Sequence, residues 1–135
     1  MKNIIFSLLC LSVIMLASCQ KDDAPETNRT RILGKWKVEK VIDEYYQPVN
    51  TLIDREETTG NPDEYIEFTA DGKVKMHSPS MGDDETTYEF IDEDTIMIED
   101  EVYDIKELVE AKLHLFQDFT EGDQRFVQNA YFIRL

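Results

Sequence analysis

The sequence predicts an all-β fold, a small up-and-down antiparallel β-barrel of about eight strands. Apolar and polar residues alternate over short runs from residue 34 onward, as they do in strands with one buried face. Short polar turns separate these runs, and Ala70-Asp71-Gly72 contains the Asp-Gly pair typical of hairpins. Only Tyr103–Leu113 also has the spacing of an amphipathic helix, which stays as an alternative to strand. Regularly spaced short strands favour a sandwich or a barrel.

Eight segments are expected to be strands. They are Gly34–Tyr46, Asp63–Thr69, Lys73–His77, Glu85–Ile91, Thr95–Glu99, Val102–Val109, Glu110–Phe119 and Phe126–Leu135. In the first, Trp36 and Val38 share one face, whereas Val41 and Tyr45 have the opposite parity. A bulge or bend near Glu39-Lys40 would reconcile the two halves.

Two longer connections lack strand periodicity. Gln47–Pro62 is polar and carries two prolines and a glycine, so we expect a long loop, with a short helix near Leu52–Glu57 as an option. Ser78–Asp84 is expected to be a second loop. If both lie at one end of the barrel, they would form its mouth.

The N-terminal 18 residues have the layout of a secretory signal peptide. Lys2 is the only charge before residue 21, and Ile4–Ala17 is almost wholly apolar. This run is shorter than the roughly 20 apolar residues that a membrane-spanning helix needs. Residues 1–18 are therefore expected to be removed.

The end of this run, Leu16-Ala17-Ser18-Cys19, resembles the lipobox of bacterial lipoproteins. The resemblance implies that Cys19 becomes the first residue of the mature chain and carries acyl chains such as palmitate. Each buried methylene of such chains contributes roughly 0.8 kcal/mol to membrane anchoring. The other cysteine, Cys10, lies in the segment to be removed, so the mature chain can form no internal disulfide. A plain signal peptide with a chance cysteine is the alternative.

The residues after the cysteine extend this resemblance. Gln20, Lys21, Asp22 and Asp23 are similar to the export signal of surface lipoproteins of the Bacteroidota. The similarity implies an outer-membrane lipoprotein exposed at the cell surface, whereas a solvated tether on a periplasm-facing lipoprotein is the alternative. We therefore expect residues 19–30 to be a lipidated cysteine with a flexible tether, and residues 31–135 to form one domain.

The composition is strongly acidic. The chain of 135 residues has 14 Lys and Arg against 29 Asp and Glu, a net charge of -15. This charge argues against nucleic acid as a partner and against anionic membrane surfaces. It favours solubility or cationic partners.

Gly34-Lys35-Trp36 resembles the Gly-x-Trp motif of lipocalins, and of the lipocalin-like domains of Bacteroidota lipoproteins in particular. The resemblance implies an eight-stranded barrel with Trp36 at its closed end. It also implies that an arginine of the last strand, here Arg134, packs across the indole. Such a cation–π contact contributes about 0.5 to 2 kcal/mol and would join the first strand to the last.

Residues of catalytic or metal-binding character are not brought together by any motif. The two histidines, His77 and His114, stand in no metal-ligand spacing, and no nucleophile or phosphate-binding motif occurs. The acidic clusters at 83–85, 92–94 and 99–101 lack the spacing of a calcium loop. We therefore expect no enzymatic activity, no metal and no cofactor.

Two functions stay open at this point. One is a non-catalytic envelope lipoprotein whose barrel binds a small apolar or amphipathic ligand. The other is an accessory protein with a filled barrel, which contacts an envelope or host protein through loops or its acidic surface. Nine residues are expected to point inward: Val38, Ile66, Phe68, Met76, Tyr88, Phe90, Ile98, Leu115 and Phe119. Of these, Ile66, Phe68, Met76, Tyr88, Phe90 and Leu115 are the candidates to line a ligand site.

Overall fold

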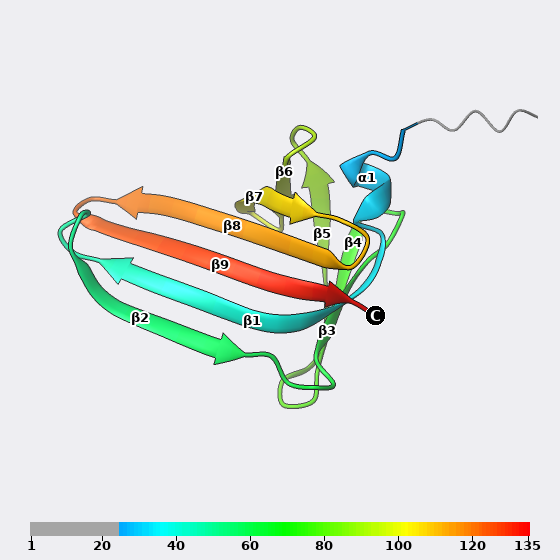
Figure 1. The fold of residues 1–135 in the computed structure, drawn as a ribbon, viewed down its shortest axis with the longest axis horizontal. Helices are drawn as coiled ribbons and strands as arrows, with labels where there is room; N and C mark the ends of the chain where they lie inside the picture. The colour runs from blue at the N-terminus through cyan, green and yellow to red at the C-terminus, as the bar shows by residue number, and fades with distance from the viewer. Residues whose placement is uncertain (1–24) are drawn as a thin grey trace, which may run out of the picture.

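The computed structural model describes residues 25–135, so the predicted signal peptide, the predicted lipidation site Cys19 and the predicted export signal Gln20–Asp23 lie outside the described residues. These residues form one short helix and nine strands, which Figure 1 labels. Their bounds are α1 (Asn28–Arg31), β1 (Gly34–Tyr46), β2 (Leu52–Thr59), β3 (Tyr65–Phe68), β4 (Lys73–Ser78), β5 (Gly82–Phe90), β6 (Thr95–Ile98), β7 (Glu101–Leu108), β8 (Lys112–Glu121) and β9 (Gln124–Arg134).

The strands close into an antiparallel barrel, as the alternation of the sequence predicted. Consecutive strands pair from β3 through β9, and β1 pairs with both β3 and β9. The closed barrel therefore has eight strands, and β2 is an additional ninth strand. Closure gives each of these eight strands a neighbour on both sides over part of its length.

Strand β1 is long enough to have two partners on one edge. Its first residues, Gly34–Lys37, pair with β3, and its later residues, 40–46, pair with β2. The outer halves of β1, β8 and β9 together with β2 extend beyond the barrel as a four-stranded sheet, which we call the wing (Figure 1).

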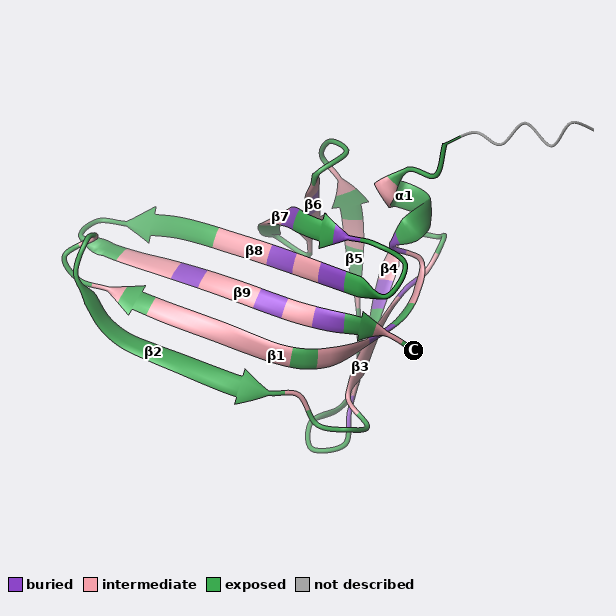
Figure 2. Cartoon of the chain, in the orientation of Figure 1, coloured by how far each residue is buried: buried purple, intermediate pink, exposed green. Residues whose placement is uncertain are grey.

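The prediction of a loop over Gln47–Pro62 was wrong, because this segment contains β2. Every residue of β2 is exposed, and its sequence LIDREETT shows no apolar alternation (Figure 2). An edge strand without a buried face needs only backbone pairing, and charged side chains protect its free edge. The periodicity that reveals a buried strand is therefore missing.

The other connection is also shorter than predicted. Strand β4 ends at Ser78 and β5 begins at Gly82, which pairs with Ser78 across the turn. Gly82 has a φ of 88°, a left-handed conformation that glycine adopts without strain. The alternative of a helix over Tyr103–Leu113 was wrong, since these residues belong to β7, β8 and the turn between them.

The predicted bulge in β1 is present. Its register with β9 shifts between Val38 and Lys40. The backbone of Gly60 approaches β1 here and donates a hydrogen bond to the carbonyl of Glu39 at 3.0 Å. A Cβ at Gly60 would lie 2.0 Å from the Val38 oxygen, so only glycine fits.

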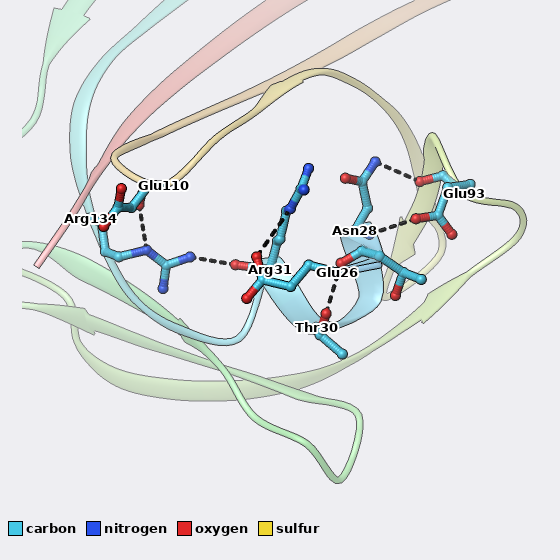
Figure 3. A network of polar contacts seen from close by, with 8 residues as sticks. Glu26, Asn28, Thr30, Arg31, Glu93, Glu110 and Arg134 are labelled. Atoms are coloured by element: carbon cyan, nitrogen blue, oxygen red, sulfur yellow. Dashed lines mark hydrogen bonds and ion pairs between the residues drawn. The ribbon is translucent and has the colours of Figure 1, made fainter. Parts of the chain in front are cut away.

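Helix α1 packs over one end of the barrel, and the ordered fold thus begins before residue 31. The backbone nitrogen of Asn28 donates to Glu93 Oε1 at 2.5 Å, and its side-chain amide donates to the Glu93 carbonyl at 2.9 Å (Figure 3). The Arg29 guanidinium lies 5.0 Å from the Phe90 ring centre. We call this the closed end of the barrel.

The tightest part of the core lies beneath α1. Six side chains there are the largest that are almost completely buried: Ile32, Trp36, Phe68, Val74, Ile96 and Leu113. The Trp36 indole has no exposed surface, and its Nε1 donates to the Ile32 carbonyl at 2.7 Å. The one polar atom of the indole is therefore satisfied within the core.

Arg134 of β9 covers Trp36 at this end, as the resemblance to lipocalins implied. Its guanidinium carbon lies 4.1 Å from the centre of the indole. The same group donates to the Leu33 carbonyl at 2.8 Å. It also donates to the carbonyls of Glu110, at 2.7 Å, and Arg31 (Figure 3). One side chain thus links the approach to β1, the end of β9 and the β7–β8 turn. We call this arrangement the clamp.

We predict that Arg134→Ala lowers the free energy of unfolding by about 2 to 3 kcal/mol. The change removes the cation–π contact and leaves three backbone carbonyls without this donor. Urea denaturation measures the loss. Arg55→Ala is the matched control, because the exposed Arg55 side chain forms ion pairs with Glu44 and Glu57 on the wing, and we expect its loss to cost less than about 1 kcal/mol. Equal losses in the two variants would show that the clamp does not hold the barrel closed.

Candidate functional site

The barrel interior contains a cavity of about 440 Å³ on the side away from the clamp. Apolar side chains from six strands form most of its wall. They are Val38, Val41, Ile66, Val74, Met76, Ile98, Leu115, Ala130 and Phe132. We call this space the barrel cavity. Its volume lies within the range of small-molecule sites, about 300 to 1,000 Å³.

Burial falls from the closed end to the opposite, open end. Trp36 and Ile96 at the closed end have no exposed surface. Val38 and Ile98, farther along the same two strands, are only partly buried although they pack against the same apolar core. The interior is therefore packed at one end and accessible at the other.

A few polar side chains stand among these apolar residues. Asp43, Tyr103 and Gln128 all line the barrel cavity. The Gln128 amide donates to Asp43 Oδ1 at 2.9 Å, and the Tyr103 hydroxyl donates to Glu101 Oε2 at 2.5 Å. Apolar walls with a small number of positioned polar groups are characteristic of ligand pockets.

The surroundings of Tyr103 favour its neutral form. Burial is the main cause that raises the pKa of its hydroxyl far above the usual 10.0. The hydrogen bond to Glu101 and the negative charges of Glu101 and Asp43 raise this pKa further. The phenol therefore stays protonated even at a pH where a free tyrosine would ionise, and it keeps its hydrogen bond to Glu101.

Three aromatic rings lie next to this mouth on the wing. The ring centre of Phe126 is 5.1 Å from that of Tyr45 and 5.3 Å from that of Phe119, with an angle of 50° between the planes in each pair. Tyr45 is 41% exposed and Phe119 is 50% exposed. We call these three residues the aromatic shelf. With Ile53 and neighbouring polar residues they line a hollow of about 510 Å³.

The prediction that Phe119 points into a buried interior was wrong. Its parity on β8 matches that of Leu113 and Leu115, which are buried. Strand β8 continues past the barrel into the wing, however, where no strand lies opposite. The same face of the strand is therefore buried near Leu115 and half exposed at Phe119.

The barrel cavity and the shelf hollow form one continuous surface. Gln128 lines both spaces. The hydrogen bond from Tyr103, which lines the cavity, to Glu101, which lines the shelf hollow, also joins them. A ligand seated in the cavity would reach the aromatic shelf.

This surface carries mainly negative charge. Its acidic residues are Asp43 and Glu64 in the cavity and Glu101 and Glu121 at the shelf. The one basic residue among those that line the two spaces is Arg125. Arg125 is already paired with Asp118 at 2.6 Å and 2.8 Å, which lowers the pKa of that carboxyl.

The six sequence-predicted ligand residues fall into two groups. Ile66, Met76 and Leu115 line the barrel cavity. Phe68, Tyr88 and Phe90 also point inward, but they pack toward the closed end and do not line it.

Contacts at the closed end explain the position of the second group. Phe68 is 1% exposed and meets Tyr88 edge to face at 5.1 Å. The Tyr88 hydroxyl donates to the Thr69 carbonyl at 2.9 Å, and Phe90 lies under Arg29 of α1. Alternation shows which face of a strand is inward, but not how far along the barrel axis a residue lies.

Sequence reasoning did not single out Asp43, Phe126 or Gln128 as ligand residues. A signal was available for Asp43, because it has the same parity as Val41 and Tyr45 beyond the bulge. Gln128 and Phe126 are its neighbours only through the pairing of β1 with β9, which the sequence does not show.

A third hollow, of about 580 Å³, lies outside the barrel between α1 and the β7–β8 turn. Its lining includes Glu26, Arg31, Glu110 and Arg134. Arg31 pairs with Glu26 at 3.4 Å, and Arg134 belongs to the clamp (Figure 3). These groups hold the closed end together, so the hollow has a structural explanation.

The two histidines lie outside the cavity. His114 contacts Asn129 at 2.9 Å and stacks on Tyr131 at 4.2 Å. His77 pairs with Asp83 and stacks on Tyr65 at 5.0 Å. Among residues 25–135, no three histidine, cysteine or acidic side chains are grouped so that they could hold a metal ion.

In the described part of the chain, no helix is long and apolar enough to cross a membrane.

Comparison with known proteins assigns no family to this chain. No protein-family model matches its sequence, and no curated protein matches it significantly.

We predict that stability falls above pH 10 and that Tyr103→Phe reduces this fall. Tyrosines in the unfolded chain ionise near pH 10, whereas the raised pKa keeps folded Tyr103 neutral. Ionisation of this residue in the unfolded state therefore lowers the free energy of unfolding as the pH rises past 10, by up to about 1.4 kcal/mol per pH unit. Urea denaturation of the wild type and of Tyr103→Phe at pH 9 and pH 11 measures how much the free energy of unfolding of each protein falls. An equal fall in the two proteins would mean that Tyr103 is not in a protected environment.

Proposed function

We propose that this chain is a non-catalytic, lipid-anchored protein of the cell envelope whose lipocalin-like barrel binds a small amphipathic ligand. The observation that carries the proposal is the apolar barrel cavity, open at the end away from the clamp. A barrel of about eight strands has room either for side chains alone or for one small ligand. Here the interior is filled at one end only.

The polar groups of the cavity support an amphipathic ligand over a purely apolar one. Asp43, Gln128 and Tyr103 lie on the wall beyond the apolar residues, toward the wing. A ligand with an apolar body and a polar head would match this order. Each of the three side chains already has a hydrogen-bond partner that fixes its orientation.

The membrane anchor is part of the proposal. We propose that Cys19 carries acyl chains and that Gln20–Asp23 direct the protein to the outer face of the outer membrane. Eight residues separate Cys19 from α1, which packs on the closed end. The anchor would then lie on the side of the closed end and leave the mouth of the cavity facing away from the membrane.

A second function is favoured by the aromatic shelf. Exposed aromatic residues are enriched where proteins contact one another, and Tyr45 and Phe119 are exposed on the wing. A protein partner, from the envelope or from a host, would bind at the shelf and leave the barrel cavity empty.

We predict that the uncharged dye N-phenyl-1-naphthylamine binds to residues 25–135 with a saturable rise in fluorescence. Met76→Trp should weaken this binding at least about tenfold, because the larger side chain occupies the mouth of the cavity. Met97→Trp is the control, since Met97 lies between Ile96 and Ile98 on β6 and points to the other face.

Circular dichroism establishes that both variants are folded. No saturable rise in the wild type, or an equal loss in the two variants, would contradict a ligand site inside the barrel. The protein-partner function would then be the better account of the aromatic shelf.

A further inference from the structure

We propose that the ligand of the barrel cavity is a cationic amphiphile, with its alkyl chain in the cavity and its charged head between Asp43, Glu101 and the aromatic shelf. This inference rests on the proposed function and adds the charge of the ligand to it. It follows from how three strands align their side chains across the mouth.

Three rows of residues cross β1, β9 and β8 on the face that lines the cavity and the shelf. The first row is Val41, Ala130 and Leu115, the second is Asp43, Gln128 and Gln117, and the third is Tyr45, Phe126 and Phe119. Going outward from the barrel, the surface is thus apolar, then polar, then aromatic. A molecule that lies along this surface contacts apolar, polar and aromatic residues in that order.

The polar row contains one charge, and this charge is negative. Asp43 is half-buried and accepts a hydrogen bond from the neutral amide of Gln128. Within residues 25–135 it forms no salt bridge, so no basic side chain balances its charge. A cation at this row would supply the missing opposite charge.

The surroundings add to the same preference. Glu101 and Glu121 line the shelf hollow next to this row. The faces of aromatic rings attract cations, and exposed or half-exposed rings beside carboxylates suit an amine or a quaternary ammonium group. Arg125, the basic residue at the shelf, is held by Asp118.

An anionic head group would meet repulsion at the same place. Its carboxylate or phosphate would lie beside Asp43 and Glu101 in a site with apolar walls, where charges are weakly screened. The same two carboxylates help to raise the pKa of Tyr103, which shows the sign of the local potential. Fatty acids are therefore expected to bind poorly.

The test compares three probes with the same tail: octyltrimethylammonium, octanol and octanoate. The full chain is held in nanodiscs of uncharged phospholipid and carries ¹³C-labelled methionine methyl groups. Met76 lines the cavity, whereas Met81 at the β4–β5 turn is 84% exposed. Binding in the cavity should shift the Met76 resonance and leave Met81 unchanged.

We predict that octyltrimethylammonium shifts the Met76 resonance at a concentration at least about tenfold lower than octanoate does. Asp43→Asn keeps the hydrogen bond from Gln128 but removes the charge, and it should weaken binding of the ammonium probe about tenfold while octanol is unaffected. Glu89→Gln removes one charge from β5 at a residue that alternates with the inward-facing Tyr88 and Phe90, and should change nothing. If Asp43→Asn does not fold, Glu101→Gln at the exposed mouth is expected to act in the same direction.

The outcomes separate this inference from the function on which it rests. If none of the three probes shifts the Met76 resonance, the cavity binds no amphiphile and both proposals fail. If octanoate or octanol binds as tightly as the ammonium probe, or if neither Asp43→Asn nor Glu101→Gln alters the preference, the cavity binds ligands but the cationic head group is wrong.

Discussion

The guanidinium of Arg134 over the indole of Trp36 is the contact on which the rest of the barrel depends. It joins the last strand to the first, and its hydrogen bonds include the carbonyls before β1 and the β7–β8 turn. The almost completely buried side chains gather at this end under α1. Because closure is secured here, the opposite end can keep apolar side chains only partly buried without loss of the barrel. A cavity at that end is the structural consequence.

Strand β1 sets the geometry of the mouth. It runs through the barrel and on into the wing, and its bulge at Val38–Lys40 brings Val41, Asp43 and Tyr45 onto the face that lines the cavity and the shelf. Gly60 fits closely against this bulge. The apolar, polar and aromatic rows therefore depend on a local irregularity of one strand, combined with its pairing to β9 and of β9 to β8.

The sequence predicted the parts of this fold that leave a periodic signal. Strands with one buried face alternate, so the barrel, the bulge in β1 and the inward side of most strands were predicted correctly. Strand β2 was missed because its exposed, charged residues need no alternation. Only three of the six predicted ligand residues line the cavity. Ile66 and Phe68, for example, have the same parity on β3 and differ only in their position along the barrel axis. Asp43 and the aromatic shelf come together through strand register, which a single sequence does not specify.

The central claim is that the interior beyond the clamp is a ligand cavity rather than packed core. Native mass spectrometry of residues 25–135, after incubation with a lipid extract of the cells that produce the protein, tests it most directly. The account predicts a discrete adduct of one molecule, which Met76→Trp abolishes and Met97→Trp retains. A clean mass of the unliganded chain across all extracts would contradict it, and the search would then turn to a protein partner for the aromatic shelf.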